Sequence, residues 1–268
     1  QGCVAVLGPL ISDNSIALQD TANEVGVPCI GWTGAHKFAS EYCFTVANGD
    51  IPTEGVMCAQ WLKAQGLERV GLFWEAGSSG KDYADYFRDT ALSVGLTVTR
   101  EVKLEPNPVG LVDDLRSMRE LGVEGLYYGG YGYATFHFAA ALKALDWDPP
   151  RFMGTAFQNA WLNEVVWNAM VGWTGIDQYD AENQVGQEFL DRYDERFGRR
   201  PEWCVPVVNR DLAVALGTGV CVRVGMAVSV ATAVALAGIA AGKSCSRWST
   251  QVTVHAIVDN TCTSARPT

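Results

Sequence analysis

The residues best suited to chemistry lie in the run Gly125-Leu-Tyr-Tyr-Gly-Gly-Tyr-Gly-Tyr-Ala134, between two segments with helical spacing. Glycines at the end of an apolar strand let the backbone approach a ligand closely. Tyrosine adds a flat ring and a hydroxyl that orients a polar group. The run therefore predicts non-covalent ligand binding. A buried strand followed by an ordinary glycine turn would give the same pattern, and this alternative stays open.

Residue patterns typical of catalysis or metal binding do not occur in the sequence. Three histidines, His36, His137 and His255, lie far apart, and none has another histidine or a cysteine at a helical spacing. The sequence has no Cys-x-x-Cys pair, phosphate loop, dinucleotide-binding glycine pattern or Gly-x-Ser-x-Gly turn. We therefore expect no metal, no cofactor and no enzymatic activity. Cys29 and Cys43 would form either a disulfide in an oxidising compartment or two buried thiols.

The elements that position the tyrosines alternate between apolar runs and segments with helical spacing. The runs that we predict as strands are Cys3–Gly8, Val27–Gly31, Val70–Trp74, Leu96–Val102, Glu124–Tyr128 and Arg151–Gly154. Continuous apolar strands suit a sheet covered by helices on both faces, and repeated strand–helix units imply parallel strands. The pattern predicts a doubly wound α/β fold.

Two stretches are expected to carry the chain between lobes. Ala47–Pro52 is rich in turn residues and precedes Thr53, which we expect to cap the next helix. Gly172–Asp180 is followed by the charged, amphipathic segment Glu182–Phe197. Two crossings would give two lobes with parallel sheets around one ligand cleft.

Length and charge narrow the class of protein. The chain has 268 residues, nearly half of them apolar, which is enough for one large domain or two modest domains with a hydrophobic core. A net charge of −10 argues against binding to nucleic acid or to an anionic membrane surface. The sequence begins at Gln1, without methionine and almost directly in an apolar strand. We therefore expect a fragment in which the N-terminal part of the first lobe, with any export signal, is missing.

The composition changes abruptly near Leu212. Residues 212–268 contain four basic side chains and one acidic one, and are rich in Val, Ala, Gly, Ser and Thr. Val224–Gly242 is uncharged and nominally long enough to span a membrane, but no aromatic residue flanks it. Three origins stay open for residues 217–268: a membrane segment, a native core segment, or a tail produced by a shift of coding frame.

Six segments carry a resemblance to a known family. They are Leu7–Ser12, Val27–Ala35, Gly71–Gly80, Tyr127–Tyr131, Arg151–Gly154, and Phe197–Pro201 together with Val205–Asn209. In this order and spacing they resemble the type I periplasmic binding proteins of the branched-chain amino acid (Leu/Ile/Val) class, which are the substrate-binding components of ABC transporters. The similarity covers about residues 1–216. It implies a remainder of the first lobe over 1–49, a second lobe over 50–174, a return to the first lobe over 175–216, and an atypical tail over 217–268.

The resemblance assigns roles to residues of both lobes. In the family, a serine after the Gly-Pro turn and a short loop bind the ligand carboxylate, and these roles fall on Ser12 and on Thr33, Gly34 and Ala35. The family's threonine in this loop corresponds to Ala35, so Thr33 would supply the hydroxyl instead. Capping of helices by Ser12 and Thr33 is the structural alternative. From the second lobe, Tyr131 would contact the ligand amine.

Two positions of the second lobe depart from the family. An aromatic position corresponds to Ser79, which would widen the pocket, and the acidic partner of the ligand amine corresponds to Ala156. Burying an ammonium without its carboxylate costs roughly 3–5 kcal/mol. Either Asp13 or Asp177 replaces the acid, or the solute is not an α-amino acid. Because Phe157 would add apolar area, we expect an uncharged or anionic solute to bind better than leucine, isoleucine or valine.

The resemblance implies a solute-binding protein of an ABC-type uptake system. It would bind a small polar solute (amino-acid-like, an amide or a carboxylate) between two lobes that close by hinge motion. Its partners would be that solute and the membrane permease, not nucleic acid, and its location periplasmic or extracellular, with a lipid anchor as one option. A ligand-sensing regulatory domain of the same fold is one alternative, and a doubly wound hydrolase or transferase is another. An enzyme needs a nucleophile–base pair or a carboxylate pair converging on the cleft, and the pattern places no histidine or paired acid near Ser12, Thr33 and Tyr131.

Overall fold

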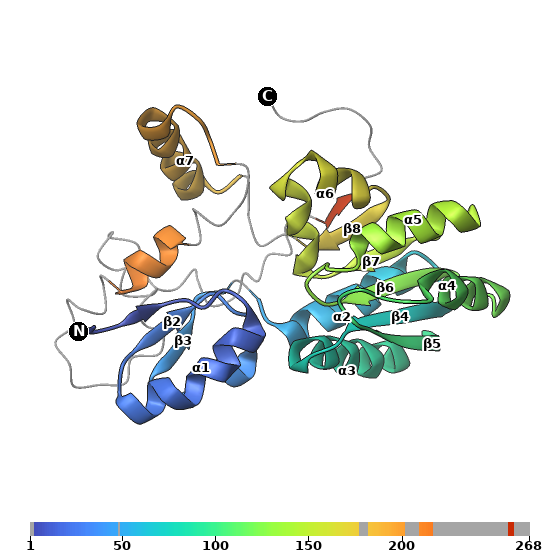
Figure 1. Cartoon of the computed structure of the whole chain (residues 1–268), viewed down its shortest axis with the longest axis horizontal. Coiled ribbons are helices and arrows are strands. Elements are labelled where there is room, and N and C mark those ends of the chain that lie inside the picture. The colour runs from blue at the N-terminus through green and yellow to red at the C-terminus, as the bar shows by residue number, and fades with distance from the viewer. Residues whose placement is uncertain (1–2, 48, 177–181, 202–208, 217–256, 260–268) are drawn as a thin grey trace. The chain divides into compact units, whose positions relative to one another are not determined.

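The structure is a computed structural model of the whole chain, shown in Figure 1. It describes residues 3–47, 49–176, 182–201, 209–216 and 257–259. The chain forms two compact units. Unit 1 comprises Gln1–Asp50 and Glu182–Val254, and unit 2 comprises Ile51–Ala181 and His255–Thr268.

Unit 1 contains a three-stranded parallel sheet in the order β1-β2-β3. Its elements along the chain are β1 (Val6–Leu7), α1 (Ser12–Val25), β2 (Cys29–Gly31), the 3-10 helix η1 (His36–Phe38) and β3 (Cys43–Thr45). Helix α1 ends at Gly26, whose left-handed backbone (φ 65°) donates its N–H to the carbonyl of Ala22. The side chains of Ala22, Cys29, Ala35, Phe38 and Cys43 form the core of this part of unit 1.

The charged segment predicted over 182–197 forms helix α7 (Gln184–Phe197), also in unit 1. Asn183 caps its first turn by accepting a hydrogen bond from the N–H of Gly186, and Gly198 (φ 69°) ends it. Leu190 is buried on its apolar side, in agreement with the amphipathic pattern. A further helical segment covers residues 209–216.

Unit 2 contains a six-stranded sheet in the order β5-β4-β6-β7-β8-β9, in which β9 alone is antiparallel to its neighbour. The strands are β4 (Arg69–Glu75), β5 (Thr97–Leu104), β6 (Gly125–Gly129), β7 (Arg151–Met153), β8 (Trp173–Ile176) and β9 (Ile257–Asp259). The helices are α2 (Ile51–Ala64), α3 (Ser78–Ser93), α4 (Leu111–Glu120), α5 (Thr135–Leu145), the 3-10 helix η2 (Thr155–Leu162) and α6 (Glu164–Ala169).

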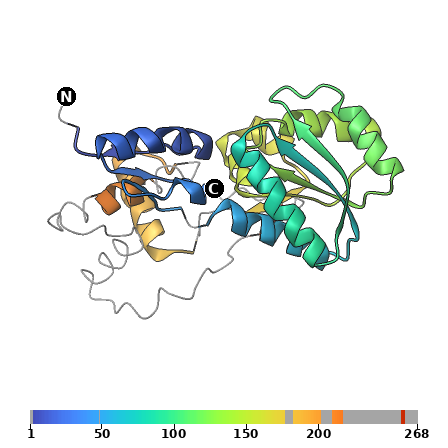
Figure 2. The same cartoon turned by 90° about the horizontal axis from the view of Figure 1, so that it is seen from below.

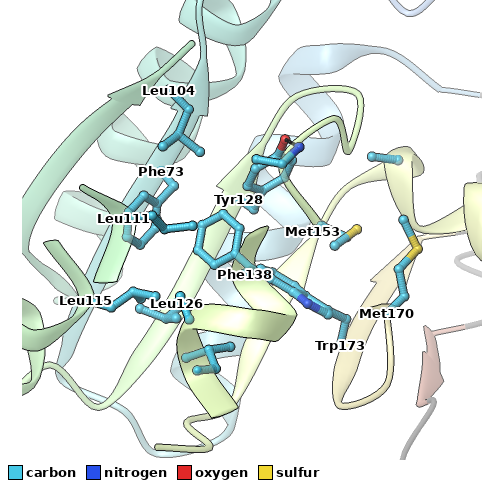
Figure 3. Close-up of a cluster of buried hydrophobic side chains, with 14 of the residues drawn as sticks. Phe73, Leu104, Leu111, Leu115, Leu126, Tyr128, Phe138, Met153, Met170 and Trp173 are labelled. Atoms are coloured by element: carbon cyan, nitrogen blue, oxygen red, sulfur yellow. Dashed lines mark hydrogen bonds between the residues drawn. The ribbon is translucent and has the colours of Figure 1, made fainter. Parts of the chain in front are cut away.

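Helices cover both faces of the unit 2 sheet, as Figures 1 and 2 show. Alternate residues of a strand point to opposite faces, so Leu72 and Tyr127 pack against α2 and α3 while Phe73 and Tyr128 face α4 and α5. In Figure 3 the ring of Phe138 lies between Tyr128 and Trp173 and meets both edge-on. The sheet is therefore buried on both faces, and the ends of its strands remain as the places where a ligand can approach it.

The structure confirms the predicted α/β fold with parallel sheets. The six predicted strands correspond to β1, β2, β4, β5, β6 and β7. Strands β3, β8 and β9 were not predicted, and β8 lies inside the stretch Gly172–Asp180 that the sequence suggested as a crossing between lobes. Helix α2 begins at Ile51, so Thr53 lies inside its first turn and is not its cap.

The tail lies almost entirely outside the described residues. Of residues 217–268 the structure describes only β9, so the three origins proposed for the tail stay open. In the described part of the chain, none of the helices has the length and apolar character needed to cross a membrane.

Candidate functional site

In unit 1 the structure brings Ser12, Thr33 and Ala35 together through a chain of hydrogen bonds. The N–H of Ala35 donates to Thr33 Oγ1 over 3.1 Å, and Thr33 Oγ1 donates to Ser12 Oγ over 2.9 Å. All three residues are buried, and Gly34 between them is half-buried. Ser12 makes no further hydrogen bond with the described residues, so its hydroxyl hydrogen is available to an acceptor. Bonds in such a chain polarise one another and strengthen the last donor.

Thr45 of β3 fixes the backbone around Thr33 through two hydrogen bonds. The N–H of Thr33 donates to Thr45 Oγ1 over 3.2 Å, and Thr45 Oγ1 donates back to the carbonyl of Thr33 over 2.8 Å. This reciprocal pair holds the loop that follows β2 against the end of the neighbouring strand. The Thr33 hydroxyl is therefore positioned by two elements, β2 and β3.

The structure bears on the helix-capping alternative differently for the two hydroxyls. The N-cap of α1 is Ile11, in an extended conformation and with no capping side chain, whereas Ser12 is the first helical residue. Ser12 is therefore not the N-cap of α1, and the N-terminal end of that helix carries the positive end of its dipole beside the hydroxyl. Thr33, in contrast, does accept the N–H of Ala35 at the start of η1.

In unit 2 the predicted contact Tyr131 lies on the loop between β6 and α5. Its side chain is half-buried, and its ring lies 5.8 Å from the ring of Tyr133 between centroids. The backbone of the loop is held on both sides: the N–H of Tyr131 donates to Glu75 Oε2 over 2.5 Å, and its carbonyl accepts from Asn159 Nδ2 over 2.8 Å. Tyr131 thus projects from a fixed backbone and not from a loose turn.

Glu75 is the last residue of β4, and its buried carboxylate accepts several hydrogen bonds. Besides Tyr131 it accepts the N–H of Tyr133 over 2.7 Å and the hydroxyl of Tyr128. The residue is 5% exposed. Burial raises the pKa of Glu75 above its ordinary value of 4.5, while the hydrogen bonds from Tyr128 and the loop oppose that rise.

A second buried carboxylate, Glu54 of α2, holds the next loop of unit 2. Its carboxylate accepts the N–H of Thr155 over 2.7 Å and also the Thr155 hydroxyl. A Cβ at Gly154 would lie 2.2 Å from Glu54 Oε2, so glycine is needed for this approach. Burial raises the pKa of Tyr83 well above its ordinary value of 10.0, and Glu54 and then Tyr131 raise it further. Glu75 and Glu54 therefore accept hydrogen bonds from two different loops of unit 2, the loop after β6 and the loop after β7.

The remaining predicted residues of unit 2 lie deeper than expected. Ser79 is fully buried in the first turn of α3. Phe157 is 1% exposed and belongs to the core, where it packs against Gly175. Ala156 is also buried. Asp177, one of the two suggested replacements for the missing acid, lies outside the described residues. The solute contacts of Ser79 and Phe157 stay predictions.

The cysteines and acidic groups give no sign of a metal site in the described part of the chain. There, no group of three or more His, Cys, Asp or Glu side chains is placed to hold a metal ion. Cys29 and Cys43 are register partners on β2 and β3, and both are free, buried thiols. Burial, together with nearby Cys43, raises the pKa of Cys29 from 9.0 to about 11. A thiol with this pKa is mostly protonated and unreactive near neutral pH.

Sequence reasoning missed Glu54 and Glu75. A signal was present for Glu75, because an acidic residue at the end of an apolar strand and before a glycine turn is unusual in a buried position. Glu54 gave a weaker signal: it lies in the first turn of a helix, where acidic residues are common. Which backbone groups each carboxylate binds depends on loops far along the chain.

This arrangement of parallel sheets in two units, with glycine-rich loops at strand ends, defines a class of α/β ligand-binding protein. The family model described as periplasmic binding protein matches residues 1–237. The chain therefore belongs to the type I periplasmic binding protein family. The match extends past Leu212, where the composition changes.

Solved structures agree on the fold. A leucine-binding protein of Thermotoga maritima is 18% identical to this chain, with a TM-score of 0.68. The match covers 80% of this chain and 62% of the Thermotoga protein. A Rhodopseudomonas palustris ABC-transporter solute-binding protein, in complex with 3,4-dihydroxybenzoic acid, is 18% identical with a TM-score of 0.67 and covers 85% and 65%. A putative branched-chain amino acid ABC transporter from Rhodospirillum rubrum is 22% identical with a TM-score of 0.60 and covers 86% and 67%.

The chain thus spans 62% of the length of the leucine-binding protein that it matches. At these identities the similarity establishes the fold alone. No curated protein matches the chain in sequence.

Proposed function

We propose that this chain is the solute-binding component of an ABC-type uptake system. It binds a small polar solute outside the cytoplasm, in the periplasm or at the cell surface, and delivers it to a membrane permease. The proposal is supported by membership of the periplasmic binding protein family and by the solute-binding names of similar structures. Binding and release need no catalytic residue.

The hydroxyl chain of unit 1 is the observation that carries the proposal. It runs from the Ala35 N–H through Thr33 to Ser12, and it ends in a hydroxyl hydrogen at the N-terminal end of α1. Such an end suits a hydrogen-bond acceptor with negative charge, because the donor and the helix dipole act together. We propose that Ser12 and the loop of Thr33, Gly34 and Ala35 receive the carboxylate or carbonyl end of the solute. Tyr131 of unit 2 is proposed separately as a solute contact, through its ring and hydroxyl.

The other end of the solute is proposed to carry no ammonium group. The family's acidic position corresponds to the buried, apolar Ala156, and an unpaired buried ammonium costs roughly 3–5 kcal/mol. We therefore expect 3,4-dihydroxybenzoate to bind better than leucine. Among structures similar in fold, one is named for leucine and another holds 3,4-dihydroxybenzoic acid, so the fold accommodates both chemistries.

The experiment is calorimetric titration of the purified chain with 3,4-dihydroxybenzoate, acetamide and L-leucine, after a thermal-shift screen of the same compounds. Ligands that bind only the folded protein raise its melting temperature. The variant is Ser12→Ala, which should weaken binding by about 1–2 kcal/mol, the scale of a lost buried hydrogen bond.

Ser15→Ala is the matched control. Ser15 is buried on the same helix, but its hydroxyl donates to the backbone carbonyl of Ile11 over 3.1 Å, so its loss should leave affinity unchanged. Equal affinity of the Ser12→Ala variant and the unmodified chain would assign Ser12 a structural role only. Micromolar binding of leucine would contradict the proposed solute class.

A further inference from the structure

The loop that carries Tyr131 is built around the carboxylate of Glu75. Groups of this segment donate to it, among them the N–H of Tyr131 (2.5 Å), the N–H of Tyr133 (2.7 Å) and the hydroxyl of Tyr128. The Tyr128 oxygen also accepts the N–H of Ala134 over 3.3 Å. One side chain from the end of β4 therefore organises most of the loop between β6 and α5.

The sequence of the loop is adapted to this carboxylate. Gly130 has φ 157°, and a Cβ there would lie 2.5 Å from the carboxylate of Glu75, so only glycine lets the backbone pass so closely. On the other side of Glu75, a Cβ at Gly80 would lie 1.9 Å from its carbonyl oxygen. Glycines at these two positions thus allow α3 and the loop between β6 and α5 to approach Glu75 closely.

Within the described part of the chain, the groups that donate hydrogen bonds to Glu75 are a tyrosine hydroxyl and backbone N–H groups, which are electrically neutral. Such a carboxylate acts as a hydrogen-bond acceptor without forming an ion pair. Each buried N–H group that it accepts would lower the stability of the fold if it had no partner. Its position, at the carboxyl end of a parallel strand, is where ligands of open α/β sheets bind.

We infer that Glu75 is the positioning residue of the proposed solute site: it holds the loop in the conformation that presents Tyr131, and it occupies the N–H groups of that loop. The inference rests on the proposed function in its solute-binding part. Because the N–H groups of Tyr131 and Tyr133 are bound to Glu75, these two groups do not serve as a backbone anion site.

The chain supplies a matched control in Glu124. Its carboxylate also accepts two backbone N–H groups, those of Glu68 (2.7 Å) and Arg69 (3.1 Å), but near the beginning of β4. Glu75→Gln and Glu124→Gln thus make the same substitution at opposite ends of one strand, in a buried contact and in an exposed contact that also faces Arg69. Tyr128→Phe is a milder second variant, which removes one donor to Glu75 and the acceptor of the Ala134 N–H.

Hydrogen–deuterium exchange of the full chain tests the positioning role without any solute. In Glu75→Gln the amides of residues 130–134 should exchange about tenfold faster or more, while amides of the β4 and β6 interior keep their rates. Tyr128→Phe should have a smaller effect confined to residues 133–134, and Glu124→Gln should leave residues 130–134 unchanged. Unchanged exchange at 130–134 in Glu75→Gln, or an equal increase throughout unit 2, would overturn the inference.

Calorimetry tests the consequence for binding, with 3,4-dihydroxybenzoate and L-leucine as probes. For a probe that the unmodified chain binds, Glu75→Gln should lower affinity about tenfold, with Glu124→Gln equal to the unmodified chain. Equal affinity of Glu75→Gln and the unmodified chain would show that positioning of the loop does not serve the solute. If the unmodified chain binds neither probe, that result counts against the proposed function, and the exchange experiment still decides the role of Glu75.

Discussion

Thr33 Oγ1 donates a hydrogen bond to Ser12 Oγ over 2.9 Å, across 21 residues of sequence. The same oxygen accepts the N–H of Ala35 over 3.1 Å. One buried hydroxyl thus joins the loop after β2 to the first turn of α1. Its loss should affect both the stability of unit 1 and the donor that Ser12 presents.

Thr33→Val is expected to lower the free energy of unfolding by about 1–3 kcal/mol, because the buried Ala35 N–H loses its acceptor while the shape of the side chain is kept. Thr33→Ser is the control, since it retains the hydroxyl and removes only a methyl group. Urea denaturation of the two variants and the unmodified chain measures the difference. A Thr33→Val variant as stable as Thr33→Ser would mean that this hydrogen-bond chain contributes nothing to folding.

Tyr131→Ala is expected to weaken solute binding by about 2 kcal/mol or more, because it removes both ring area and a hydroxyl. Tyr131→Phe separates the two effects, since it keeps the ring. Calorimetric titration with the best solute of the panel measures both variants. Full affinity in Tyr131→Ala would show that the resemblance had been carried to the wrong residue of this loop.

Gly80→Ala is expected to destabilise the chain by about 1–3 kcal/mol, the usual cost of overpacking. Its Cβ would lie 1.9 Å from the carbonyl oxygen of Glu75, which is backbone and cannot turn away. Gly49→Ala is the control, because a Cβ there meets nothing within 4 Å. The measurement is the urea midpoint at constant m-value. Equal midpoints for the two variants would rule out this close contact between α3 and β4.

The stability of the chain is expected to depend on pH through Glu75. Burial raises the pKa of Glu75 in the folded chain above 4.5, so between that value and the raised pKa the folded state binds more protons than the unfolded state. This group's contribution to stability therefore falls as pH increases through the window that begins near 4.5. Glu75→Gln removes the contribution.

Urea denaturation at several pH values from about 4.5 upward, at constant ionic strength, measures this dependence. The free energy of unfolding of the unmodified chain should decline with pH more steeply than that of Glu75→Gln. Glu124→Gln is again the control. The pKa of Glu124 is lowered, chiefly by the backbone N–H groups it accepts, so its titration lies below this window. Parallel pH profiles for the unmodified chain and Glu75→Gln would contradict the raised pKa.

The elements that sequence reasoning missed were those without a local pattern. β3 (Cys43–Thr45) is three residues long, too short to show an apolar period, and it forms because β2 offers a parallel partner in register. β8 (Trp173–Ile176) includes a glycine and a threonine and looked like a turn. It becomes a strand beside β7, where Gly175 makes room for Phe157.

What the sequence by itself determined was the alternation of strands and helices, and with it the α/β class and the family. The α/β class follows from local periodicity and from glycines at strand ends. The family follows from the resemblance of six segments in their order and spacing. It also singled out Ser12 and Thr33, whose contact the structure shows.

Only the tertiary structure decided which backbone groups the buried side chains bind. Glu75 reaches N–H groups 56 and 58 residues further along the chain, and Glu54 reaches one 101 residues away. Such pairings depend on the order of strands in the sheet, which no local pattern encodes. Tertiary packing likewise decided the burial of Phe157, which lies in the core against Gly175.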